Sequence, residues 1–260
     1  MLLVRRYFFG VPIKTIFFAK KINLFDAFSL KQFVHSFFIK KVWGFKYDVG
    51  YTLHSDLSLT EDVLLQQFSS TCRNEVRRSI KDGIVCSEQK NIDEYIRFFN
   101  DFASQKAING VNAKRVASYG DNLIVFKAEL DGEVLAMHSL LVDYGASIVL
   151  LLTSANARFE DSKKRTIIGR ANRHLHYYEM LYFKERGLKI YDWGGMAKEE
   201  DVVVNPGLKG VNDFKLSFGG VYMENIIYSS YLFLFAQKLG VLLGKVKNNS
   251  ELQKESRNEK

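Results

Sequence analysis

The stretch LIVFKAELDGEVLAMHSLLVDYGASIVLLLT, residues 123–153, decides the fold. Its first two segments, Leu123–Leu130 and Val134–Val142, are joined by Asp131-Gly132, a pair that tolerates the positive φ of a two-residue hairpin turn. Tyr144-Gly145 turns the chain again, and the following segment, Ser147–Thr153, is apolar between its ends, as expected of a central strand. The stretch therefore predicts an antiparallel meander of three strands.

Downstream of the meander, helical and strand patterns alternate. Gly187 marks the end of a long helix, because glycine is favoured just after a helix C-cap. The predicted segments are a helix over residues 167–186, a strand over 188–193, a short helix over 208–218, a strand over 221–228 and a final helix from 231 to about 246. This order predicts an α/β (α+β) fold with a mixed, mainly antiparallel central sheet flanked by helices.

Upstream, a strand is expected over residues 48–57 and helices over 59–81 and 91–106, the first of them capped by Thr60. Residues 1–47 are rich in aromatics and contain no readable motif. No Pro/Gly/Ser-rich linker interrupts the middle of the chain, so we expect one domain over 1–246, with an N-terminal part (1–121) and a core (122–246). The polar tail, 247–260, is expected to be disordered.

Composition narrows the class of protein. The 260 residues are 47% hydrophobic and 25% charged, and the formal net charge of +8 favours anionic partners such as nucleic acid, anionic lipid or phosphate-bearing cofactors. Cys72 and Cys86 have no metal-ligand spacing, and no metal is implied. No signal peptide and no membrane-spanning run is recognised, so a cytoplasmic location is expected. The sequence does not indicate an oligomeric state.

The start of the long helix is the chemically suggestive position. Free N–H groups and the positive dipole end at a helix N-terminus bind phosphate. Gly169 and Ala171 would let a pyrophosphate approach the backbone, and nearby basic residues would add charge. The basic residues are Lys163, Lys164, Arg165 and Arg170. The alternative is a solvated basic face.

Two resemblances involve this region. Thr166-Ile-Ile-Gly169-Arg170-Ala171 resembles the acyl-CoA pyrophosphate loop of GNAT acyltransferases, Gln/Arg-x-x-Gly-x-Gly/Ala, with Thr166 at the Gln/Arg position. Three blocks, Cys72–Ile84, Arg170–Met196 and Gly207–Gly220, look like the FemAB-like branch of the GNAT superfamily and occur in the expected order.

The resemblance implies transfer of an acyl or aminoacyl group to an amine. The donor would be acyl-CoA or acetyl-CoA, as in most GNAT proteins, or aminoacyl-tRNA, as in the Fem enzymes, and the acceptor an amino sugar or another cell-surface glycan precursor. The cofactor-binding residues implied are Arg165, Thr166, Ile168, Gly169, Arg170 and Ala171. The alternatives are a non-catalytic binding protein with the GNAT frame and a nucleic-acid-binding module.

Candidate site residues follow from what acyl transfer needs: a neutral amine, a held carbonyl and a protonated leaving group. Asp192 and His138 are the candidate catalytic residues, each with a structural role as the alternative. His174 and His176 lie two apart on a helix and cannot share a face. The candidate substrate-binding residues are His176, Tyr191, Trp193 and Lys215.

Two further surfaces could bind partners. Arg73, Arg77, Arg78 and Lys81 form a basic helical face that could meet tRNA, another nucleotide or a lipid head group, the alternative being a solvated face. The final helix has apolar residues at helical spacing near lysines, so it either packs on the domain or contacts a membrane peripherally, at its inner face.

Overall fold

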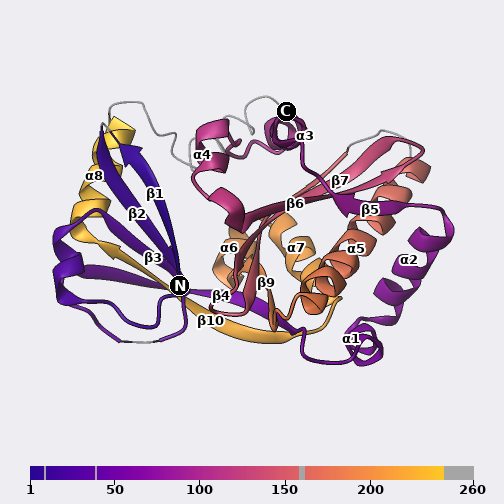
Figure 1. Cartoon of the computed structure of the whole chain (residues 1–260), viewed down its shortest axis with the longest axis horizontal. Coiled ribbons are helices and arrows are strands. Elements are labelled where there is room, and N and C mark those ends of the chain that lie inside the picture. The colour runs from indigo at the N-terminus through magenta and orange to yellow at the C-terminus, as the bar shows by residue number, and fades with distance from the viewer. Residues whose placement is uncertain (9, 39, 158–161, 243–260) are drawn as a thin grey trace. The chain divides into compact units, whose positions relative to one another are not determined.

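The computed structural model describes residues 1–8, 10–38, 40–157 and 162–242 (Figure 1). The predicted disordered tail, 247–260, lies outside this part of the chain. The strands are β1 (Leu2–Phe8), β2 (Val11–Phe17), β3 (Lys31–Ser36), β4 (Phe45–Asp56), β5 (Val85–Glu88), β6 (Leu123–Leu130), β7 (Glu133–Asp143), β8 (Ile148–Asn156), β9 (Ile190–Met196) and β10 (Val221–Ser230). The helices are η1 (Leu24–Phe28), α1 (Glu61–Gln67), α2 (Ser70–Lys81), α3 (Ile92–Gln105), α4 (Ala113–Ala117), η2 (Gly120–Asn122), α5 (Ser162–Glu185), α6 (Glu199–Val204), α7 (Gly207–Leu216) and α8 (Tyr231–Leu242).

Contacts between Cα atoms divide the chain into two compact units. Unit 1 comprises Met1–Gly50, Ala103–Tyr119 and Glu224–Lys260, and unit 2 comprises Tyr51–Phe102 and Gly120–Met223. The single domain expected over residues 1–246 stays a prediction, and the units are described separately.

The sheet of unit 2 has the strand order β4-β9-β8-β7-β6-β5. Every pair is antiparallel except β8 and β9, which run parallel, so the predicted mixed, mainly antiparallel sheet is confirmed. The predicted hairpin between β6 and β7 is also confirmed, since Asp131 and Gly132 both have positive φ, 51° and 81°. Both central residues of a type I′ turn need this conformation.

Helices cover both faces of this sheet, and Figure 1 shows α3 and α5 on opposite sides of β6 and β7. Neighbouring residues of β7 show the same arrangement, because successive strand side chains point to opposite faces. His138 contacts Asn172 of α5, whereas the Ser139 hydroxyl accepts a hydrogen bond from Tyr95 of α3. The apolar core under α5 includes Phe126, Leu175 and Trp193.

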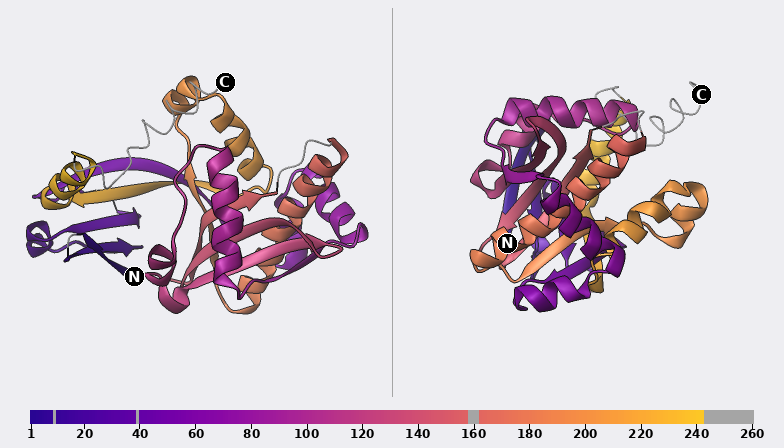
Figure 2. Two further views of the ribbon diagram at one scale, coloured as in Figure 1. Left: turned by 90° about the horizontal axis from the view of Figure 1, so that it is seen from above. Right: turned by 90° about the vertical axis from the view of Figure 1, so that its right-hand side faces the viewer.

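Several elements differ from the sequence expectations. The expected helix over residues 59–81 is two helices, because Phe68 is extended and the Ser69 hydroxyl caps α2 by accepting from the Cys72 N–H. The long helix begins at Ser162, five residues before the expected start. The strand expected to end at Trp193 continues through Gly194 and Gly195. The charged loop after it contains α6, which with α7 forms the pair of orange helices following β9 in Figure 2.

Unit 1 contains the aromatic segment that had no readable motif. Its strands follow the order β1-β2-β3-β10-β4, with β2 and β3 parallel. A small core of buried residues, including Phe33, Phe45 and Tyr228, fills its interior. α8 contacts β3 and η1, so the final helix does pack on this unit. No helix among the described residues has both the length and the apolar character needed to cross a membrane.

Replacing Gly219 with alanine should destabilise unit 2 more than the same change at Gly132. Both residues have positive φ, 73° and 81°, which costs alanine about 1–2 kcal/mol. A Cβ at Gly219 would lie 2.7 Å from the Gln67 carbonyl oxygen, whereas a Cβ at Gly132 meets nothing within 4 Å. We expect Gly219→Ala to lower the free energy of unfolding by at least about 1 kcal/mol more than Gly132→Ala in urea titrations. Equal losses would contradict the close approach.

Candidate functional site

The parallel strands β8 and β9 separate after a short paired stretch. Their register pairs Ile148–Leu150 with Ile190–Asp192, although β8 continues to Asn156 and β9 to Met196. Beyond the paired stretch, β8 stays paired with β7 and β9 with β4. Within the described residues no ladder pair joins the rest of the two strands. Backbone N–H and C=O groups along this split can therefore bind an extended ligand.

Each of the two strands is irregular where they separate. The register of β8 against β7 shifts between Ser139 and Leu140, and that of β9 against β4 shifts between Thr52 and His54. Such bulges bend a strand and increase its twist. In β9 the bend lies at Gly194, with φ of 70°, where a Cβ would be 2.9 Å from the Leu151 carbonyl oxygen. Glycine is therefore required where the split begins.

The carboxylate of Asp192 holds this bend. It is fully buried, accepts a hydrogen bond from the Gly194 N–H at 2.9 Å and another from the Thr52 hydroxyl. The same hydroxyl lies 2.8 Å from the Gly194 carbonyl oxygen. The second carboxylate oxygen lies 3.2 Å from His54 Nε2. His54 Nε2 is itself buried against this carboxylate, whereas the His54 side chain as a whole is 12% exposed, so other atoms of the side chain reach solvent.

Lys215 of α7 lies beside this cluster. Its Nζ donates a hydrogen bond to the Gly195 carbonyl oxygen at 2.7 Å. Burial lowers the pKa of Lys215 to about 8, against the opposing attraction of Asp192. The ammonium group is therefore mostly charged at pH 7 and can lose its proton within the physiological range.

A second polar cluster lies under α5, on the other face of the sheet. His138 contacts Glu179 through Nδ1 at 2.7 Å and Asn172 through Nε2 at 2.6 Å. The Tyr191 hydroxyl donates to Glu179 at 2.7 Å and lies 2.9 Å from His176 Nδ1. The two histidine rings stack with their centroids 4.1 Å apart. Both ring nitrogens of His138 are thus occupied within a buried network.

Burial shifts the titration of this network. It lowers the pKa of His176 to about 4, and the neighbouring His138 acts in the same direction. Burial alone would raise the pKa of Glu179, but the charge and hydrogen bonds of His138 and His176 outweigh it and lower that pKa to about 2. Burial and Glu179 together raise the pKa of Tyr191 well above its usual value. The network therefore favours an ionised Glu179 beside a neutral His176.

The cluster also corrects the expectation that no metal-ligand set exists. His138, His176 and Glu179 each offer a ligand atom within 4.8 Å of the others. Two imidazoles and a carboxylate are a set that zinc accepts. However, a metal would have to displace the hydrogen bonds just described, so the present geometry fits a structural network better than a metal centre.

The predicted phosphate cradle lies inside α5 rather than at its start. Because the helix begins at Ser162, its free N–H groups belong to residues 162–165, and those of Thr166–Ala171 are within the helical ladder. The helix therefore starts earlier than expected, and donor binding by Thr166–Ala171 stays a prediction. Ile168 and Ala171 are buried, and a Cβ at Gly169 would make only an ordinary contact, 3.6 Å from Arg173 Nη1.

Charged side chains near the start of α5 separate into paired and exposed groups. Arg170 is bound to Asp82 at 2.9 Å and Glu75 at 3.1 Å, which raises its pKa. Arg165 and Thr166 are exposed. Lys163 and Lys164 carry side chains outside the described part of the structure. An anion could therefore meet Arg165 directly, but Arg170 only in competition with two carboxylates.

The basic face of α2 is confirmed in part. Arg77, Arg78 and Lys81 are exposed and line a hollow of about 470 Å³. Arg73 instead turns back and donates hydrogen bonds to the carbonyl oxygens of Gln66 and Phe68. α2 packs against α5, so this face and the start of α5 belong to the same unit.

Comparison with known proteins identifies the fold. No family model and no curated protein matches the sequence. Among solved structures, FemX has a TM-score of 0.63 at 13% identity, covering 92% of this chain and 85% of its own. The chain has the GNAT-like fold of FemX. L-PGS from Bacillus licheniformis has a TM-score of 0.53 at 13% identity, covering 84% of this chain and 74% of its own. The C-terminal domain (DUF2156) of a candidate lysylphosphatidylglycerol synthetase from Agrobacterium fabrum has a TM-score of 0.54 at 12% identity, covering 81% and 72%.

The sequence analysis missed several residues of these clusters, among them Thr52, His54 and Glu179. Thr52 and His54 lie two apart on β4, and that spacing puts them on one face of a strand, so the alternation of the segment contained the signal. Glu179 follows His176 by three residues on α5, the spacing of helix neighbours. None of the three could be linked to Asp192 or His138 without knowing which strands pair.

Acid should destabilise the protein through His176. The folded-state pKa of about 4 lies below the ordinary value of 6.5, so the unfolded chain binds the proton first. The free energy of unfolding should fall by up to about 3 kcal/mol between pH 6.5 and pH 4 from this residue. Below pH 4.5 Glu179 should add to the loss, since its folded-state pKa is also depressed. His176→Gln should flatten the upper part of this dependence in urea titrations, and an unchanged slope would contradict the assignment.

Thr52→Val should loosen the Asp192 cluster. The change keeps the shape of the side chain but removes the hydroxyl that donates to Asp192 and lies 2.8 Å from the Gly194 carbonyl oxygen, at a cost of about 1–3 kcal/mol. The matched control, Thr52→Ser, keeps the hydroxyl and should lie closer to the wild type. Thermal unfolding measures both variants. A serine variant less stable than the valine variant would show that packing, rather than the hydroxyl, holds this position.

Proposed function

We propose that this protein is an N-acyltransferase that moves an acyl group from an activated donor to an amine. The observation that carries the proposal is the split between β8 and β9, bordered by the His54–Asp192 pair and Lys215. The FemX fold supports the same class of reaction, although the likeness by itself concerns the fold alone.

The acceptor amine must lose a proton to attack a carbonyl carbon. His54 is the proposed general base, because an imidazole oriented by a buried carboxylate, on a side chain that is partly exposed, can accept that proton. Asp192 would hold the ring and stabilise the imidazolium without touching the acceptor, so it acts as a positioning residue. General bases of this kind contribute typically about 10²–10⁴-fold to the rate.

The carbonyl oxygen of the donor gains negative charge during the attack. Lys215 and the backbone N–H groups of β8 beyond Leu150 are the proposed donors toward this oxygen. The bond from the carbonyl carbon to the thiolate or alkoxide of the donor then breaks, and the leaving group takes up the proton that His54 removed from the amine. Lys215, a candidate substrate-binding residue in the sequence analysis, would therefore contact the reacting carbonyl group of the donor.

Under this proposal, the remaining candidate residues stabilise the strands and the helix that form the site. His138, His176 and Tyr191 share the buried network that ties β7 and α5 to β9. The Trp193 indole N–H donates to the Ser55 hydroxyl at 3.0 Å and so ties β9 to β4. Their contribution would be positioning of the split rather than proton transfer.

Acyl-CoA or acetyl-CoA is the first proposed donor. Its phosphates would meet the N-terminal turn of α5, where Arg165 and Thr166 are exposed, and Gly169 leaves room along the helix. The acceptor would be an amino sugar or cell-surface glycan precursor, in keeping with the sequence resemblance. We propose that this reaction takes place in the cytoplasm, with the inner face of the membrane as the alternative location.

Aminoacyl-tRNA is the second proposed donor, and the exposed Arg77, Arg78 and Lys81 favour it. A polynucleotide contacts several phosphates at once, so a basic face on α2 suits it better than a single pyrophosphate. Binding of tRNA would then fall steeply with salt and with Arg77→Gln/Arg78→Gln, whereas binding of CoA would depend on Arg165.

Donor binding and turnover test the proposal separately. Acetyl-CoA, CoA and charged tRNA are each added to the protein, and a bound donor should raise the melting temperature. Turnover is then followed with the donor that binds and a panel of amino sugars. His54→Asn should lower kcat by at least about 100-fold with donor binding unchanged. His35→Asn, the same change in unit 1, is the matched control.

The outcomes distinguish the alternatives. Full turnover in His54→Asn would exclude His54 as the general base but would not contradict the proposal that the protein is an acyltransferase. Absence of binding by any of the three donors would instead favour a non-catalytic protein with the GNAT frame. Lys215→Met should lower kcat more than it changes KM, because its proposed contact forms only as charge develops.

A further inference from the structure

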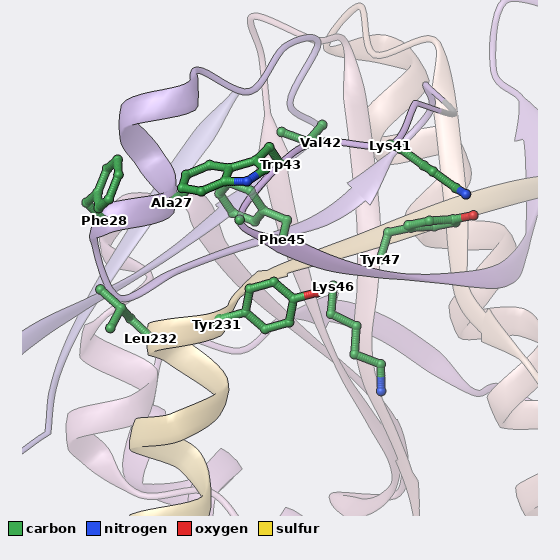
Figure 3. Close-up of a pocket in the computed structure, with 11 residues that line it drawn as sticks. Ala27, Phe28, Lys41, Val42, Trp43, Phe45, Lys46, Tyr47, Tyr231 and Leu232 are labelled. Atoms are coloured by element: carbon green, nitrogen blue, oxygen red, sulfur yellow. The ribbon is translucent and has the colours of Figure 1, made fainter.

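Unit 1 has an open groove of about 900 Å³ that the proposed reaction does not use. Figure 3 shows Phe28, Trp43, Tyr231 and Leu232 around it, with Lys41 and Lys46 among its lining residues. We call these six residues the aromatic groove. They come from η1, the segment before β4, the start of β4 and the first turn of α8.

The aromatic side chains of the groove are exposed to an unusual degree. Phe28 and Trp43 are each 68% exposed and Tyr231 is 62% exposed, although large aromatic rings gain most from burial. The Phe28 and Trp43 rings lie 5.8 Å apart, so they form one surface. Contiguous exposed apolar patches of this kind mark sites of interaction.

The apolar surface continues along α8. Leu232, Phe235 and Leu239 are exposed and lie three and four residues apart, which puts them on one face of the helix. The final helix therefore packs on unit 1 with one face and presents apolar side chains with another. This exposed face extends the aromatic groove by two turns.

The charged residues that line the groove have one sign. Lys41 and Lys46 are exposed, and Figure 3 shows their amino groups directed away from the rings of Phe28 and Trp43. None of the lining residues, all within the described part of the chain, has a carboxylate. The nearby Asp26 is already bound to Lys31. Basic residues around exposed aromatic rings are the composition of surfaces that enter the lipid interface.

We propose that the aromatic groove and the exposed face of α8 bind the surface of an anionic phospholipid bilayer. The rings of Phe28, Trp43 and Tyr231 would enter the boundary between head groups and acyl chains, where aromatic side chains are favoured. Lys41 and Lys46 would meet lipid phosphates. The open shape of the groove suits a broad surface better than a small ligand, which proteins usually enclose.

Vesicle binding with tryptophan fluorescence tests this directly. The chain has two tryptophans, and Trp193 is 1% exposed, so a change in emission on binding reports Trp43. The full-length protein is mixed with vesicles of phosphatidylcholine alone or with roughly one third phosphatidylglycerol. We expect sedimentation with the anionic vesicles, a blue shift of the emission, and weaker binding at high salt. Trp43→Phe should keep the sedimentation and lose the shift.

Matched variants separate charge from apolar contact. Lys41→Gln/Lys46→Gln should weaken binding to anionic vesicles about 30-fold, since each lysine near such a surface contributes roughly fivefold. Lys90→Gln/Lys189→Gln removes the same charge from exposed positions outside the groove and should change binding by less than about twofold. Phe28→Ser/Leu232→Ser should weaken binding at least about tenfold. Its control is Val203→Ser/Val221→Ser, which replaces two exposed apolar residues of unit 2.

Several results would overturn the proposal. These are equal binding to neutral and anionic vesicles, no binding to either, or equal losses in the groove variants and their controls. A blue shift that appears without vesicles as the protein concentration rises would assign the groove to a second copy of the chain instead. Circular dichroism of each variant verifies that it is folded before binding is measured.

Discussion

The hydrogen bonds that hold Gly194 next to Asp192 are the interaction on which the candidate site depends. The carboxylate binds the Gly194 N–H and the Thr52 hydroxyl, and the same hydroxyl reaches the Gly194 carbonyl. This arrangement fixes a left-handed residue inside a strand, where the ladder with β4 shifts register. Because β9 follows β4 after the bend, it leaves β8, and the split opens between two strands that are otherwise parallel neighbours.

The opposite face of the same strand explains why the bend can be maintained. Tyr191 and Trp193 flank Asp192 but point toward α5 and the segment after α7, where Tyr191 binds Glu179 and Trp193 packs on Phe218. An ionised carboxylate in this interior requires several hydrogen bonds to offset its desolvation, and Glu179 has them. Polar networks above and below β9 therefore hold one strand from both faces, which limits the positions that Gly194 can adopt.

The sequence predicts the strands and turns of unit 2 better than it predicts the contacts of the candidate site. Apolar alternation and Asp131-Gly132 specify β6 and β7, because turn chemistry and strand period are local properties. Asp192, His176 and Lys215 were identified as candidates, but their partners depend on which strands pair. Thr52 lies 140 residues before Asp192, and no local pattern links them. The aromatic segment of unit 1 was unreadable for the same reason, since β3 pairs with β10 near the other end of the chain.

The early start of α5 has a consequence for how a donor could be held. A helix binds phosphate through its first free N–H groups, so extending it to Ser162 moves that capacity away from Gly169. Arg170, which would have faced the phosphates, is instead tied to Glu75 and Asp82 beside α2. The ion pairs leave Arg77, Arg78 and Lys81 as the exposed cations of α2. Among the described side chains, exposed positive charge is therefore found on a face of α2, which could meet several phosphates of a polynucleotide, and at Arg165 in the first turn of α5, which could meet a pyrophosphate.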